Sequence, residues 1–147
     1  MRAIVCAIRG GPYSQSTIDK AISFARETGR PLYFLYIVNL DFLAHTTSTR
    51  THTITHEMEQ MGEFILLAAQ NRAADRGVVA EGRVRHGSVG AEIIALCNEL
   101  NAGIIVMGRP QRGEEEGDVF THARLNSFAD LVKKQTGAEV IMPDREA

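Results

Sequence analysis

Short apolar runs alternate with segments of helical periodicity along the whole chain. In the first helical segment, apolar side chains recur three and four residues apart at Ile18, Ala21, Ile22 and Ala25, which is the spacing of one helix face. Similar segments follow each later apolar run except the last. The runs predict strands at residues 3–8, 32–38, 78–85, 104–107 and 140–143. The pattern therefore predicts five strands and four helices in strict alternation.

The composition of the strand segments predicts how the strands are arranged. Residues 32–38 hold seven apolar side chains without a polar break, which is typical of a strand covered on both faces in a parallel sheet. Residues 78–85 alternate only partly, which favours a position nearer an edge. Strands that alternate with helices imply right-handed crossovers and helices on both faces of the sheet. The expected fold is one α/β domain over residues 1–147, with a five-stranded parallel sheet.

Helix ends are marked by capping residues and glycines. Serines at the starts of the first, third and fourth helical segments resemble N-caps, at Ser16, Ser88 and Ser127. Gly29 and Gly77 are expected to end the first two helices. The periodicity also predicts inward-facing residues in the second and fourth helices, namely Met58, Met61, Ile65, Ala68, Leu131 and Val132.

Composition narrows the class of protein. Hydrophobic residues make up 44% and charged residues 23% of 147, which excludes a disordered chain and a disulfide scaffold. A net charge of -2 argues against a general nucleic-acid binder. No apolar run approaches the roughly 18 residues of a membrane span, and the opening segment is too short for a signal peptide. Cys6 and Cys97 lie in apolar runs, so we expect buried, reduced thiols in a cytoplasmic protein.

The topology predicts where a ligand would bind. In an open parallel sheet, ligands bind beyond the carboxyl ends of the strands, where the strand order reverses, and common five-stranded orders place the first strand beside the fourth. The loops after these strands, residues 9–13 and 108–113, are rich in glycine and arginine, which suit close backbone approach and anion binding. The start of the last helix near Ser127 would add free amides. Tight strand-to-helix turns also need glycine, so the loops alone leave both explanations open.

Several segments together resemble the universal stress protein family. They are the opening strand followed by Gly10 and a serine-containing helix start, and residues 35–38, 86–94, 101–108 and 138–143. These pieces cover nearly the whole chain in the family's order. The resemblance implies a Rossmann-like sheet of strand order 3-2-1-4-5, a role in the stress response and, in many members, ATP binding.

The ATP-binding members carry a glycine motif that this chain matches only in part. Gly108 matches its first glycine and Ser127 its final serine, while Gln111 and Asn126 stand where two glycines belong. Fourteen residues separate Gln111 from Asn126, so the intervening loop is longer than in the motif. Arg9 stands where ATP-binding members end the first strand with aspartate, and Ile37 matches the position whose backbone contacts adenine. The resemblance therefore implies cofactor-binding candidates at Arg9, Gly10, Ile37, Gly108, Arg109, Gln111, Asn126 and Ser127.

The long loop changes the electrostatics of this candidate site. Residues 109–118 carry four carboxylates against Arg109 and Arg112, and carboxylates near a phosphate weaken its binding unless Mg²⁺ bridges them. Arg9 either adds an anion contact or pairs with the loop and closes the crevice. The first hypothesis is a stress-response protein that binds ATP, ADP, AMP or a related anion, with Mg²⁺ for a triphosphate. The alternative is a signalling or protein-interaction module without ATP. A nucleotide-activating ligase ranks last, because residues 9–12 match its phosphate loop poorly.

No catalytic motif emerges from the sequence. There is no Gly-x-Ser-x-Gly elbow and no phosphate loop with lysine, and neither His86 nor His122 has an evident nucleophile as partner. His52 and His56 would share a helix face, yet no cysteine lies near them, so a solvated helix entry is expected instead of a metal site. We therefore expect little or no catalysis, at most slow nucleotide hydrolysis, and no metal bound by the protein alone.

The last strand suggests a partner. In the family that the chain resembles, this strand pairs antiparallel with its copy in a second chain. Val140, Ile141 and Met142 form a short apolar strand at the end of the chain, and an exposed edge of this kind favours pairing. We expect a homodimer and no nucleic-acid or membrane partner.

Overall fold

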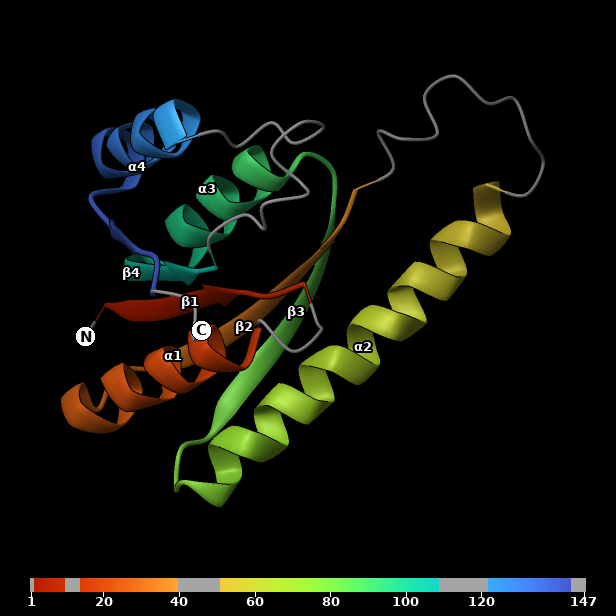
Figure 1. Cartoon of the computed structure of the whole chain (residues 1–147), viewed down its shortest axis with the longest axis horizontal. Coiled ribbons are helices and arrows are strands. Elements are labelled where there is room, and N and C mark those ends of the chain that lie inside the picture. The colour runs from red at the N-terminus through yellow and green to blue at the C-terminus, as the bar shows by residue number, and fades with distance from the viewer. Residues whose placement is uncertain (1, 10–13, 40–50, 109–121, 144–147) are drawn as a thin grey trace.

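The chain alternates strictly between strand and helix. The computed structural model describes residues 2–9, 14–39, 51–108 and 122–143. The strands are β1 (Ala3–Ala7), β2 (Leu32–Val38), β3 (Ala80–His86), β4 (Ala102–Met107) and β5 (Glu139–Ile141). The helices are α1 (Ser14–Thr28), α2 (Thr51–Asp75), α3 (Val89–Leu100) and α4 (His122–Thr136) (Figure 1). The predicted order of elements is confirmed.

The five strands form one parallel sheet in the order β3-β2-β1-β4-β5. This confirms the predicted strand order and the edge position of the third strand. Ala7, the last residue of β1, lies opposite Leu35 of β2 and Met107 of β4. The chain thus leaves β1 toward β2 and later returns on the other side as β4, which makes the end of β1 the switch point of the sheet.

Two helices cover each face of the sheet (Figure 1). Side chains that alternate along the strands fill two separate cores, because successive strand residues point to opposite faces. One core, under α1 and α2, contains Ile4, Cys6, Phe34 and Val38. The other, under α3 and α4, contains Val5, Leu35, Ile93, Ile105 and Val132. Both cysteines are free and buried, as predicted.

The helix starts differ from the sequence prediction at two places. Helix α1 begins at Ser14, two residues before the expected cap at Ser16. Helix α4 begins at His122, so Ser127 lies in its second turn and is not its N-cap. Helix α3 does begin directly after Ser88, although the Ser88 side chain makes no capping hydrogen bond. A serine followed three residues later by an acid occurs inside helices as well, so this pattern alone does not locate a helix end.

The ends of α1 and α2 follow the prediction. Gly29 and Gly77 have φ angles of 71° and 80°, which glycine adopts without strain. The Gly29 N–H donates to the Ala25 carbonyl oxygen at 2.8 Å and so completes the last turn of α1.

The inward faces of α2 and α4 were predicted only in part. Met58 and Ile65 pack against the core, but Met61 is 58% exposed and Ala68 is exposed. In α4, Val132 is buried while Leu131 is 42% exposed. Both helices carry apolar residues on more than one side, so periodicity did not single out the face that packs. No helix among the described residues is long and apolar enough to cross a membrane.

Candidate functional site

The carboxyl ends of β1 and β4 lie side by side, as predicted. The Ile8 N–H donates to the Leu35 carbonyl oxygen at 2.9 Å, so the pairing of this segment with β2 extends to Ile8. The next residue, Arg9, is exposed. Gly108 follows Met107, the register partner of Ala7. The parallel pairing therefore brings Arg9 and Gly108 to the same part of the sheet edge.

Gly108 lies close to the start of α1. A Cβ atom added at Gly108 would lie 3.2 Å from Oγ1 of Thr17, which is tighter than ordinary van der Waals contact. Thr17 is itself buried, with 3% of its surface exposed. A side chain at position 108 would have to displace this hydroxyl. Packing against Thr17 is therefore a sufficient reason for the glycine at the end of β4.

The thiols of the two cores are not suited to nucleophilic chemistry. The Cys6 Sγ lies 3.9 Å from the Thr17 carbonyl oxygen, and complete burial raises its pKa far above the usual range. Burial likewise raises the pKa of Cys97 to about 12, against a smaller opposing effect of the Arg2 charge. Since the thiolate is the nucleophilic form, both cysteines act as small apolar core residues.

The ends of β2 and β3 form the other side of this edge. Val38 lies opposite His86, and its carbonyl oxygen accepts a hydrogen bond from the Gly87 N–H at 3.1 Å. Nε2 of His86 lies 2.8 Å from Oε1 of Glu59 on α2. The sequence offered no signal for this contact, because 27 positions separate the two residues. The contact ties the third turn of α2 to the end of β3. Among the described residues, no group of three His, Cys, Asp or Glu side chains could hold a metal ion.

The other predicted site residues fall into three groups. Ile37, one residue before the end of β2, is partly buried and packs against the core under α3 and α4. Ser127 is exposed and lies in α4, as does Asn126, whose side chain is outside the described residues. Because Ser127 is five residues into the helix, its amide is no longer one of the free N–H groups at the helix start. Gly10, Arg109 and Gln111, together with the acidic residues of 109–118, lie outside the described residues.

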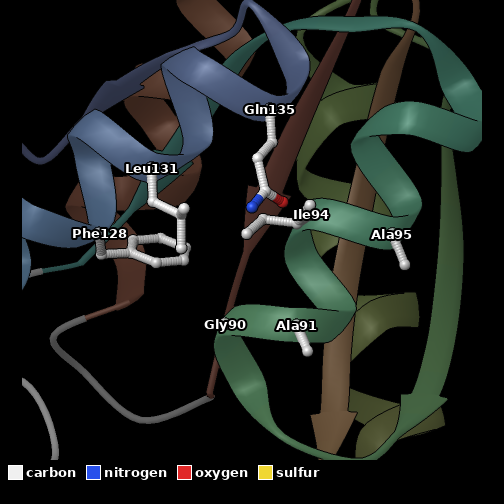
Figure 2. Close-up of a pocket in the computed structure, with 7 residues that line it drawn as sticks. All are labelled: Gly90, Ala91, Ile94, Ala95, Phe128, Leu131 and Gln135. Carbon is white, nitrogen blue, oxygen red and sulfur yellow. The ribbon is translucent and has the colours of Figure 1, made fainter.

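A separate apolar groove runs between α3 and α4. It has a volume of about 430 Å³ and is lined by Gly90, Ala91, Ile94, Ala95, Phe128, Leu131 and Gln135 (Figure 2). Figure 2 shows Gln135 as its only polar side chain among those labelled, with the amide lying near Ile94. A groove without a charged lining residue does not suit a phosphate, so the sheet edge remains the candidate for an anion.

Comparison with known proteins decides the family. The model of the "Universal stress protein family" matches residues 1–135. The chain belongs to the universal stress protein family. A curated member, "Universal stress protein YxiE" of Bacillus subtilis (strain 168), is 26% identical over 113 residues, which span 71% of this chain and 76% of that protein. The family predicted from the sequence is thus confirmed.

Solved structures of family members share the fold. Universal stress protein UspA from Lactobacillus plantarum superposes with a TM-score of 0.74 at 14% identity, over 98% of this chain and 99% of that one. A universal stress protein in complex with cAMP gives a TM-score of 0.68 at 19% identity, over 99% and 98%. The Archaeoglobus fulgidus protein in complex with dAMP gives 0.64 at 19%, over 97% of each chain. At these identities the likeness establishes the fold, including the predicted Rossmann-like strand order.

Proposed function

We propose that this universal stress protein binds a nucleotide or a related anion at the carboxyl edge between β1 and β4, with little or no catalysis, as part of a stress response. The observation that supports the proposal is the pairing of Ala7 with Met107 at the switch point of the sheet, after which the chain continues to Arg9 and Gly108. This is the place where doubly wound folds bind ligands. A guanidinium there can hold a phosphate through two parallel hydrogen bonds.

The site favours one phosphate over three. Ser127 lies in the second turn of α4, so its amide is not free to bind a terminal phosphate. Gln111 and Asn126 also replace glycines of the ATP motif. The cAMP and dAMP complexes of two proteins with this fold carry a single phosphate each, and they support the same preference. A nucleoside monophosphate is therefore the ligand proposed first, with ADP or Mg²⁺-ATP as weaker ligands.

Calorimetric titration with AMP, cAMP, ADP and ATP, with and without Mg²⁺, tests the proposal. The Arg9→Gln variant should bind AMP about tenfold more weakly or worse, because a hydrogen bond to a charged group contributes about 1.5–3 kcal/mol. Arg26→Gln is the matched control, since it removes the same charge in the last turn of α1, away from the sheet edge. Equal affinities of the two variants would remove Arg9 from the site.

A second candidate function rests on the same departures from the ATP motif. With the Ser127 amide inside α4, the crevice lacks one backbone donor that the motif implies. A protein-interaction module of this fold would then use the domain without a nucleotide. If no nucleotide at millimolar concentration releases or absorbs heat, this second function replaces the first.

The proposed partner is a second copy, paired through β5. This strand is an edge of the sheet, and Val140, Ile141 and Met142 are only partly buried. Unpaired backbone groups at such an edge favour addition of another strand. We place the protein in the cytoplasm, because the free thiols of Cys6 and Cys97 suit a reducing compartment. A monomeric mass at micromolar concentration in light scattering would contradict the dimer.

A further inference from the structure

The first part of α2 lies apart from the core. Residues 51–61 are called the leading segment below. No side chain described between residues 53 and 61 is buried, whereas the later part of the helix has buried residues at Gly62, Leu66, Ala69 and Ala73. Among the hydrophobic side chains that the structure describes in the leading segment, Met58 alone packs against the core. Figure 1 shows the start of α2 standing away from the ends of β2 and β3.

The sequence of the leading segment favours a helix only weakly. Residues 51–56 are Thr, His, Thr, Ile, Thr and His, and β-branched residues and histidine form helices less readily than alanine, leucine or glutamate. The first turn carries no acidic residue, so no carboxylate there offsets the positive end of the helix dipole. The leading segment therefore depends on contacts with the rest of the protein for its helical form.

The later part of α2 is held closely. A Cβ added at Gly62 would lie 2.8 Å from Cε1 of the Tyr36 ring, closer than real Cβ contacts, so the helix lies directly against β2 at this point. Further along, Nε of Arg72 donates to Oδ1 of Asp19 on α1 at 2.6 Å. Glycine is also a poor helix former. The close attachment thus begins at Gly62, a position where the helix itself is weak.

A side-chain contact joins the leading segment to the sheet. Nε2 of His86, the last residue of β3, lies 2.8 Å from Oε1 of Glu59. Glu59 lies in the third turn of α2, so about 12 Å of helix precedes this contact. The two side chains are 51% and 37% exposed, and a pair this open to water changes an equilibrium by about two- to fivefold. A contact of that strength biases a short segment toward one state without fixing it there.

We propose that the leading segment opens and closes as a unit while the rest of α2 stays folded, with Gly62 as the boundary and the contact between His86 and Glu59 favouring the closed state. Contiguous segments with few buried contacts unfold locally at a lower free energy than the whole protein. In the closed state the segment borders the end of β3 at the carboxyl edge of the sheet, since Glu59 contacts the last residue of that strand. Opening removes this border, so the segment is an order–disorder switch beside the edge.

Hydrogen exchange of the wild-type chain, followed by mass spectrometry, tests whether the segment opens independently. The N–H groups of residues 55–61 bond to carbonyl oxygens four residues earlier in the same helix, so their exchange reports the opening. After correction for intrinsic rates, they should exchange about tenfold faster, or more, than the N–H groups of residues 66–73. Equal protection of the two parts would show that α2 opens only as a whole and would overturn the proposal.

Variants of the contact test what holds the segment closed. His86→Ala and Glu59→Ala should each speed the exchange of residues 55–61 about two- to fivefold and leave residues 66–73 unchanged. Glu57→Ala is the matched control, because it makes the same replacement on an exposed side chain two positions away. If Glu57→Ala has the same effect as Glu59→Ala, or if residues 66–73 speed up by the same factor, the contact does not hold the leading segment and the proposal falls.

A stabilising variant tests the same switch in the opposite direction. Thr53 is exposed in the first turn of α2, and Thr53→Asp places a carboxylate near the positive end of the helix dipole. The exchange of residues 55–61 should then slow about two- to fivefold, again without change in residues 66–73. An unchanged rate would show that the stability of the segment as a helix does not set its opening, and would overturn the proposal. All these measurements use the protein without nucleotide, so their outcome is separate from the function proposed for the sheet edge.

Discussion

The contact of Gly62 with Tyr36 predicts that a single methyl group would destabilise the protein. Gly62 lies in the middle of α2, where alanine normally stabilises a helix by about 1 kcal/mol relative to glycine. Here the added Cβ would meet three atoms of the Tyr36 ring, two of them at 2.8 and 3.0 Å and Cδ1 nearer still. Tyr36 is 8% exposed and is packed among the buried residues of β2, so its ring has little room to move.

The two effects can be weighed against each other. Overpacking a core lowers the free energy of unfolding by about 1–3 kcal/mol. Because the added Cβ would meet three atoms of the buried Tyr36 ring, we expect a cost at the upper end of that range. After the gain in helix propensity is subtracted, Gly62→Ala should lower the free energy of unfolding by about 2 kcal/mol. For a chain of this size, that difference lowers the melting temperature by about 4–8 °C.

Thermal and urea unfolding followed by circular dichroism would measure the change. The Tyr36→Leu background supplies the control, since it removes the ring and should make Gly62→Ala neutral or stabilising. A Gly62→Ala protein as stable as the wild type would refute the steric argument. Destabilisation that persists in the Tyr36→Leu background would show that the clash is with something other than the ring.

Three further predictions concern other contacts. The pKa of Asp19 is lowered, chiefly by its hydrogen bond to Arg72, so the stabilisation it provides is present at neutral pH and is lost as the pH falls through the folded-state pKa. Asp19→Asn should therefore cost about 1 kcal/mol at pH 7 and nothing near pH 2, and a pH-independent difference in urea midpoints would contradict this. Cys6 and Cys97 should resist alkylation at pH 8 until the chain unfolds, as followed by mass spectrometry, and rapid modification of the folded protein would contradict their burial. Arg2 donates to carbonyl oxygens at the end of α4 and in β4 at 2.9 Å each, so Arg2→Ala should lower the free energy of unfolding by about 1–2 kcal/mol, whereas an unchanged urea midpoint would show that these bonds contribute nothing.

The helices show how far periodicity carries a structural prediction. In α1 the apolar residues fall on one side only, and Ile18, Ala21 and Ile22 are buried as predicted. In α2 apolar residues surround the helix, and the side that packs combines large residues such as Leu66 with the small Gly62 and Ala69. Gly62 lets the helix approach the Tyr36 ring closely, and with that side of α2 against the sheet Met61 and Phe64 remain exposed. Hydrophobicity alone does not distinguish the buried Leu66 from the exposed Leu67.

The surroundings of the candidate site were also predicted only in part. The neighbourhood of the first and fourth strands follows from the alternation of elements and the topology of doubly wound sheets, and the pairing of β1 with β4 confirms it. That Arg9 and Gly108 bind a ligand there stays a prediction. The start of α4 was placed too late, because Ser127 resembles a cap although the helix already begins at His122. The contact between His86 and Glu59 had no counterpart in the sequence analysis, since it depends on how α2 lies across the end of β3.

The sequence by itself determined the order of strands and helices, the parallel sheet and the family, because local periodicity and short motifs are enough to predict each of them. Only the tertiary structure decided which side of α2 packs, where α4 begins and what His86 contacts. These features depend on the fit between residues far apart in the chain, such as Gly62 against Tyr36. In a closely packed core, a single methyl group decides whether two such residues fit. A pattern of hydrophobic and polar positions carries no information at that scale.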